Sequence, residues 1–414
     1  MLYKVARSLP CLCFYFYHPD HHKNNYCYFS KLDILESFFS VNPLGAARGT
    51  YKIVQVYYTL IDVPKQQRSQ VDRMQLALVF REKLLKKYPM SVIFQKLVQD
   101  LKTLEEGIAV NILGCNKIVR FGLLLYSADN LEAHTLSGLS ASFSSKSVCR
   151  ACHIQYEQLD DNIHDYDGSS FHSRWTVDEY DSIVDALVPD KQIDTTDEQQ
   201  FDEEQIIYEY CDSDSYDDAE SGSDCSEHEA GTIENDWGVK TKCPFNELQS
   251  FHCIQGFPFD LMHDWMEGVI AEDLLSIIRT LASSDWFTIE EYNNELSKFG
   301  WYSYEANDKP CSVPISRKVS KLRGNAISHW LHIRYFPMII KKFIINPADE
   351  ALDLALKLHE ITERITAPSF FDYEADILGE DIIDYLEARK LLRLEHPDLF
   401  KRPKPKHHFM RSVF

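Results

Sequence analysis

A long acidic segment sets the main constraint on how this chain of 414 residues folds. Residues 194–236 contain seventeen aspartates and glutamates and no lysine or arginine. Because like charges repel one another and the segment offers little apolar surface, we expect a disordered acidic insertion over 193–240. The net charge of the whole chain is −21, and removing this segment leaves about −4. The folded parts are therefore expected on either side of it.

The remaining charge leaves a nucleic-acid partner open. Basic clusters lie at 81–87, 316–323 and 401–408. They fit phosphate contacts, although solvated helix faces and tails explain such clusters more often. No apolar run is long enough to span a bilayer, so we expect no membrane partner. Eleven mostly scattered cysteines are typical of a reducing, intracellular compartment.

The part before the acidic segment has an α/β pattern. Residues 50–63 alternate and are rich in β-branched and aromatic types, which predicts strands, and 117–129 reads as a buried strand. Between them, 68–106 carries apolar residues every three to four positions, which predicts two helices separated at Pro89. Residues 1–29 have no clear assignment, although their apolar stretch 9–17 is compatible with a buried strand.

The part after the acidic segment is predicted to be a mainly helical region over 241–414. Thr288 and Glu291 form the sequence pattern of a capping box, which marks one helix start. The expected helices cover 259–282, 287–299, 324–344, 348–365 and 380–396. The predicted fold class is therefore α/β plus α.

A CxxC motif is the first candidate for a metal site. Cys149 and Cys152 are separated by two residues, so both thiolates can bind one tetrahedral zinc ion from a tight turn. A structural zinc ion takes four ligands, and the sequence contains no second CxxC. A chance pair of cysteines and a redox pair are the alternatives. The candidate histidine partners are His153, His164, His172, His407 and His408.

Two groups of acidic residues are candidates for chemistry or for capping. Asp129 ends a predicted core strand, where open α/β sheets place catalytic groups and where helix caps are also common. Asp260, His263, Asp264 and Glu267 share one face of a predicted helix. They are suited to bind a divalent cation, and equally to cap a helix N-terminus.

Several blocks, in one order along residues 30–414, resemble transposases of the CACTA (En/Spm) type. The resemblance is closer to the transposon-derived proteins of that group in animal genomes. It is carried by "FSVNPLGAARGTYKIVQVYYTL", "YSADNLEAHTLSGLSASFSSKSVCRACH", "FHCIQGFPFDLMHDWMEGVI", "RGNAISHWLHIRYFPMII" and "KPKHHFM". It implies that 30–148 is part of an RNase H-like mixed sheet, followed by a zinc-knuckle-like segment over 149–192. It also implies a DNA partner and a nuclear location.

The resemblance assigns roles to the zinc candidates. Cys149 and Cys152 match the thiolate pair of the family's zinc-binding insertion. His407 and His408 match the first half of a late histidine pair, and no histidine follows them in this sequence. The resemblance therefore implies a structural Zn²⁺ with an incomplete set of ligands.

The resemblance also implies three carboxylates that hold two Mg²⁺ ions for phosphodiester chemistry. Asp129 matches the second acid. No aspartate stands at the position of the first, where Glu36 or Asp33 is the substitute, and the sequence ends before the position of the last, where Glu267 is the substitute.

We therefore expect a truncated, transposase-derived protein that is a catalytically inactive remnant of a DNA strand transferase, with the Mg²⁺ function lost. One alternative is a domesticated zinc module that binds DNA or chromatin. The other is an active metal-dependent nuclease that uses Glu36, Asp129 and Glu267. The sequence predicts no oligomeric state.

Overall fold

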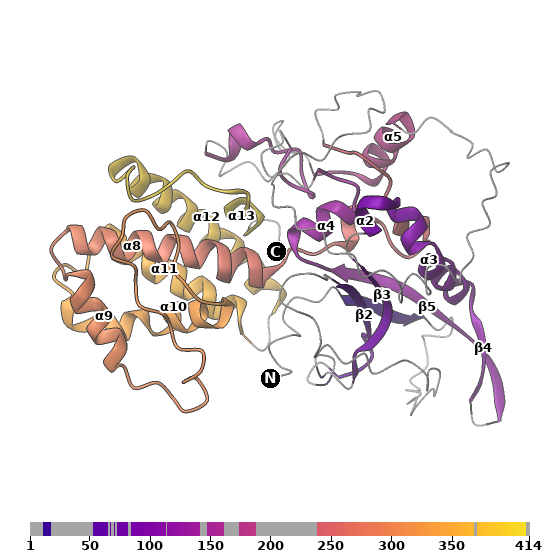
Figure 1. Cartoon of the computed structure of the whole chain (residues 1–414), viewed down its shortest axis with the longest axis horizontal. Coiled ribbons are helices and arrows are strands. Elements are labelled where there is room, and N and C mark those ends of the chain that lie inside the picture. Colours follow the sequence, from indigo (N-terminus) through magenta and orange to yellow (C-terminus); the bar gives the residue numbers. More distant parts are fainter. Residues whose placement is uncertain are drawn as a thin grey trace, which may run out of the picture.

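The computed structural model describes residues 53–64, 67, 70, 73–81, 84–112, 114–140, 147–160, 174–187, 238–367 and 371–410, and the backbone of 11–17. These residues form a mixed α/β portion and a helical portion (Figure 1). Several predictions concern residues outside these ranges, namely those for Asp33, Glu36, His164, His172 and nearly all of the acidic insertion.

A five-stranded mixed sheet forms the centre of the α/β portion, in the order β3-β2-β1-β5-β4. Its central strand β1 runs parallel to β2 and antiparallel to β5. The outer pairs, β2 with β3 and β4 with β5, are antiparallel. The strands are β1 (Cys11–Tyr17), β2 (Ile53–Leu60), β3 (Gln75–Arg81), β4 (Ile108–Ile112) and β5 (Cys115–Ser127).

The two strands that the sequence indicated most clearly are present. The stretch predicted over 117–129 is β5, and the stretch predicted over 50–63 contains β2. Helix α3 (Met90–Glu106) packs against β5 and buries Phe94, Val98 and Leu101 in the sheet-side core. The burial of these apolar residues is what the helical spacing after Pro89 predicted.

The predicted helix over 68–88 is wrong for most of its length. Residues 75–81, "QLALVFR", form strand β3, which pairs with β2 from Ile53 opposite Arg81 to Tyr58 opposite Gln75. Only Leu84–Lys87 is helical in this stretch, as α2. Residues 76–80 are all apolar, and so short an apolar run does not distinguish a strand from a helix, so pairing with β2 decides the outcome.

The chain completes the sheet-side core before it enters the helical portion. Phe245 and Phe257 lie 5.3 and 5.4 Å from the ring of Tyr126 on β5. Gly138, with φ +72°, has room only for hydrogen, because a Cβ there would lie 1.8 Å from the carbonyl oxygen of Thr241. The short elements on this side of the molecule are α4 (Asn130–Leu136), η5 (Tyr156–Asp160), α5 (Val177–Leu187), η6 (Pro244–Glu247) and α7 (Cys253–Gly256).

The helical portion packs around its own large apolar core. The predicted capping box is confirmed: the amide of Glu291 donates to Thr288 Oγ1 at 3.1 Å, and the amide of Thr288 donates to the Glu291 carboxylate at 2.8 Å. The helix predicted over 259–282 is a π-helix followed by an α-helix. The elements are η7 (Met262–Ile270, the π-helix), α8 (Ala271–Ser283), α9 (Ile289–Lys298), α10 (Ala326–Ile340), η8 (Lys341–Phe343), α11 (Glu350–Ile365), α12 (Asp372–Glu395) and α13 (Pro405–Phe409).

None of the helices within the described ranges combines the length and the apolar character that a membrane span requires.

The core of the helical portion yields a direct stability prediction. Leu358 on α11 is fully buried, so Leu358→Ala removes apolar contacts and leaves a cavity. We expect the free energy of unfolding to fall by about 2–5 kcal/mol in urea titrations. Leu391→Ala on α12 is the matched control, because Leu391 is 60% exposed, and it should change stability by less than about 0.5 kcal/mol. Equal effects of the two substitutions would contradict the packing described here.

Candidate metal centre

Three buried side chains from distant parts of the sequence meet between the two portions of the molecule. The ligand atoms of Cys149, Cys152 and His408 all lie within 4.8 Å of one another. The Sγ of Cys152 is 3.2 Å from the Nε2 of His408, which follows it by 256 residues. Within the described ranges this is the only such group of three or more histidine, cysteine or acidic side chains. The cluster could hold a metal ion.

A tight turn and a small apolar core position the two cysteines. The amide of Ala151 donates to Cys149 Sγ at 3.3 Å, which is the backbone-to-sulfur contact that a CxxC turn allows. The amide of Val148 donates to the carbonyl of Ile154 at 3.3 Å and closes the turn. The side chains of Val148, Ile154, Leu159 and Phe409 surround the sulfur atoms and bury them.

The surroundings of Cys149 favour a thiolate. Burial raises the pKa of this thiol, but hydrogen bonds from Cys152 and His408 and the charge of His408 outweigh burial. The pKa of Cys149 is therefore held well below its ordinary value. Metals bind the thiolate form, so this environment suits a metal ligand.

Helix α13 separates the two neighbouring histidines that the sequence offered as ligands. His408 points to the cysteines, whereas His407 Nε2 lies 3.1 Å from Asp273 Oδ2. His407 Nδ1 accepts the amide of Lys404 at 3.1 Å, so both ring nitrogens have partners away from the cysteine pair. Adjacent residues on a short helix point about 100° apart, which is why one of them joins the cluster and the other does not.

The partner of His407 belongs to a buried network of its own. Asp273 on α8 accepts hydrogen bonds from Arg389 Nε at 2.8 Å and from the Tyr385 hydroxyl at 2.5 Å. Burial raises the pKa of the Asp273 carboxyl, but the charges of Arg389 and His407 outweigh it and hold the pKa well below its usual range. The network therefore ties α13 to α8 and α12.

Asp129 lies where the sequence placed it, directly after β5, and caps α4. Its Oδ1 accepts the backbone N–H of Glu132 at 2.8 Å. The next residue, Asn130, accepts a hydrogen bond from Arg150 Nη1 at 2.6 Å through Oδ1 and donates to Asp264 through Nδ2. Asn130 therefore joins the CxxC turn to the π-helix.

Arg150, between the two cysteines of the motif, is the anchor of this junction. It is 3% exposed and donates to the carbonyls of Phe257 at 3.3 Å and Pro258 at 2.7 Å. Its guanidinium lies 3.9 Å from the ring centroid of Phe259. Burial lowers the pKa of Arg150 to about 10, which leaves it charged at neutral pH. The motif thus supplies both ligands and a buried cation that fixes their turn.

The acidic residues of the π-helix segment accept hydrogen bonds from separate partners. Asp260 accepts the amides of Met262 and His263 at 2.9 and 3.1 Å, as a helix cap. Glu267 accepts the amide of Ala326 at 3.0 Å, and Asp264 meets Asn130. Across the described part of the chain, no carboxylates gather in a group of three with ligand atoms in mutual reach.

Sequence reasoning identified the three ligands but missed the residues that support them. A signal for Asn130 and Arg150 was available in the sequence, because Asn130 follows Asp129 and Arg150 follows Cys149. His134 had none: it lies close enough to Cys149 for that charge to raise its pKa, although burial and Arg150 lower it overall. His153, an early candidate ligand, instead lies 3.5 Å from Glu179 and packs on Trp175.

Comparison with known proteins finds no matching family model, no matching curated protein and no matching solved structure.

The buried Asp264 carboxyl predicts a pH dependence. Asp264 is 2% exposed, and burial, which outweighs Lys406 and Arg150, raises its pKa to about 7. The folded chain therefore holds a proton that the unfolded chain releases near pH 4, so stability falls as pH rises from about 4 to about 7. We expect Asp264→Asn to remove this contribution and to be more stable than the wild-type chain at pH 8 by roughly 2–4 kcal/mol.

Urea titrations at pH 5 and pH 8 measure the effect. The exposed Asp178 on α5 provides the control, and Asp178→Asn should behave as the wild-type chain at both values. A loss of stability in Asp264→Asn at pH 8 would contradict the prediction.

Proposed function

We propose that this chain is a transposase-derived protein in which a structural zinc ion on Cys149, Cys152 and His408 fastens the α/β portion to the helical portion. In this proposal the protein does not catalyse DNA strand transfer. The observation that carries the proposal is the placement of His408 Nε2 3.2 Å from Cys152 Sγ, inside an apolar core, across 256 residues of sequence.

The chemistry of the three side chains favours zinc. Thiolate and imidazole donors together suit Zn²⁺ better than Mg²⁺ or Ca²⁺, which prefer oxygen. Zn–S and Zn–N bonds of about 2.3 and 2.0 Å put tetrahedral ligand atoms roughly 3.5 Å apart. Cys152 Sγ and His408 Nε2 are 3.2 Å apart, and no two of the three ligand atoms are more than 4.8 Å apart, so these distances bracket that spacing. Three donors leave one tetrahedral position for a further ligand.

The resemblance to CACTA-type transposases supports the assignment of origin. The CxxC follows the strand-end Asp129, and a late histidine returns to it, in the order that the resemblance implies. A five-stranded mixed sheet with an acid directly after a core strand is compatible with part of an RNase H-like core. DNA as an ancestral partner and the nucleus as the location are part of this proposal.

The proposed lack of strand transfer follows from how the candidate acids are used. Two-metal catalysis requires carboxylates that share two ions a few ångströms apart. Asp129 caps α4 and Glu267 caps the start of α10, and neither belongs to a group of three ligands in the described ranges. Mg²⁺ therefore has no role in the proposed present function.

The zinc site is tested by metal content and stability. We expect the wild-type chain to bind one Zn²⁺. At a free zinc concentration about a thousandfold above the dissociation constant, bound zinc should add about 4 kcal/mol to the apparent stability, and a strong chelator should remove this contribution. Cys152→Ser and His408→Ala should not retain stoichiometric zinc. Cys311→Ser, which removes an exposed thiol elsewhere, is the control and should bind zinc as the wild-type chain does. Full zinc content in Cys152→Ser would contradict the site.

The catalytic part of the proposal is tested with DNA. We expect the purified chain to show no cleavage or joining of DNA ends with Mg²⁺ or Mn²⁺, because Asp129 and Glu267 each accept a backbone N–H at a helix start. Strand transfer that Asp129→Asn abolishes would overturn this part and favour an active nuclease. Binding of the same DNA in a gel shift, weakening steeply as salt rises, would instead favour a domesticated DNA-binding module.

A further inference from the structure

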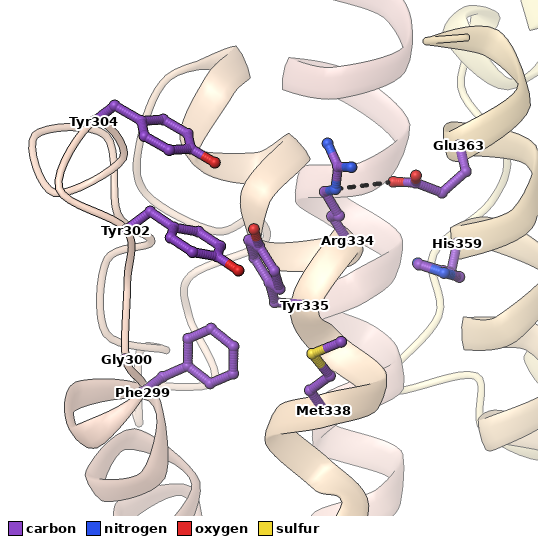
Figure 2. A pocket seen from close by; sticks show the side chains of 9 residues that line it. All are labelled: Phe299, Gly300, Tyr302, Tyr304, Arg334, Tyr335, Met338, His359 and Glu363. Carbon is purple, nitrogen blue, oxygen red and sulfur yellow. Dashed lines mark ion pairs between the residues drawn. The ribbon is translucent and has the colours of Figure 1, made fainter.

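A second site lies in the helical portion, away from the metal cluster. Residues at the end of α9, in the following loop and on α10 and α11 line an open pocket of about 530 Å³. This volume is in the range of small-ligand pockets. Its lining consists of Phe299, Gly300, Tyr302, Tyr304, Arg334, Tyr335, Met338, His359 and Glu363 (Figure 2).

Aromatic rings form one wall of this pocket. Figure 2 shows the rings of Phe299, Tyr302 and Tyr304 one above another, facing Tyr335 on α10. Tyr302 and Tyr304 are stacked with centroids 5.5 Å apart and planes 6° apart, and they are 59% and 76% exposed. Phe299 lies 5.2 Å from Tyr335. Large aromatic faces that remain in water at a pocket rim are available to a ligand.

A buried carboxylate holds the aromatic wall and α10 together. Glu305 is 8% exposed and accepts hydrogen bonds from the Tyr335 hydroxyl at 2.9 Å and from the Tyr302 amide at 3.3 Å. No basic group of the described residues forms an ion pair with it. Glu305 therefore places a negative charge next to the lining residues Tyr302 and Tyr335, without an ion-pair partner in the part of the chain that the structure describes.

The other charged residues at the pocket nearly cancel. Arg334 Nε lies 3.5 Å from Glu363 Oε1, drawn as the dashed line in Figure 2. The guanidinium of Arg334 also lies 4.9 Å from the ring centroid of Trp330, so it is held on α10. This pair leaves Glu305, which hydrogen-bonds two of the lining residues, as a negative charge beside the pocket.

We propose that this pocket binds a quaternary ammonium group. The faces of aromatic rings attract cations, and quaternary ammonium ligands favour such cages because they carry charge without hydrogen-bond donors. The Glu305 carboxylate, next to the lining residues Tyr302 and Tyr335, adds to the attraction. The ligand is a trimethylammonium group, either on a methylated lysine of a partner peptide or on a choline-type headgroup. The proposal does not rest on the metal centre or on the origin of the chain.

Calorimetry on the full chain with matched probes tests this site. Choline is compared with 3,3-dimethylbutan-1-ol, which has the same shape without the charge, and a trimethyl-lysine peptide is compared with its unmethylated form. We expect each cation to bind at least about threefold more tightly than its control. The tighter of choline and the methylated peptide then identifies the source of the headgroup. Equal binding of choline and the alcohol, or no binding of either cation, would overturn the proposal.

Substitutions locate the binding within the pocket. Tyr304→Ala should weaken binding of the preferred cation by about threefold to thirtyfold, whereas Tyr304→Phe, which keeps the ring, should preserve it. The matched control is Tyr373→Ala, because Tyr373 is 62% exposed and stacks on Phe371 at 5.8 Å on α12, outside the pocket. Equal losses in the two alanine variants would overturn the assignment. A single-stranded oligonucleotide that displaces choline through the same tyrosines would overturn it as well, in favour of base stacking.

Discussion

The contact of His408 with the Cys149–Cys152 pair is the interaction on which the arrangement of the two portions depends. It joins the CxxC turn, which follows the sheet, to α13, the last helix of the described chain. Cys152 and His408 are 256 residues apart in the sequence. The contact lies inside a small apolar core distinct from the two large ones. A metal ion in such a place converts binding free energy into stability of the junction, because the unfolded chain does not preform the site.

The surrounding contacts fix α13 from several sides. Lys406 Nζ donates to the carbonyl of His263 on the π-helix at 2.7 Å. Gly268 allows this approach, since a Cβ there would lie 2.6 Å from Lys406 Cδ. Together with His407 on Asp273, these contacts hold the ring of His408 at the cysteines. Helix α13 therefore packs against the helical portion at the π-helix.

Local sequence signals predicted the parts of the fold that are locally determined. The strand before Asp129 and the capping box at Thr288 follow from periodicity and from one residue pair, and both are present. Strand β3 was not predictable in this way, because residues 76–80 are all apolar, a pattern that fits a strand or a helix, and pairing with β2 decides between them. The π-helix likewise receives hydrogen bonds from Lys406 and Asn130, which lie far away in sequence.

The candidate site also combines features that local sequence predicts with features that depend on distant contacts. The CxxC spacing indicated two ligands, and the histidine pair indicated where a third would come from. Which histidine contributes depends on how α13 is oriented, and Asp273 sets that orientation from the far side of the helix. The sequence shows Arg150 only as a residue inside the motif. Its role as an anchor was not predictable, because the carbonyls of Phe257 and Pro258 that it binds lie over a hundred residues later.

X-ray absorption at the zinc edge, on the protein loaded with one equivalent of Zn²⁺, tests the central claim most directly. The account predicts two sulfur scatterers at about 2.3 Å and an imidazole nitrogen at about 2.0 Å. A first shell of oxygen and nitrogen without sulfur would show that the cysteine pair and His408 do not share a metal ion, and would contradict the account.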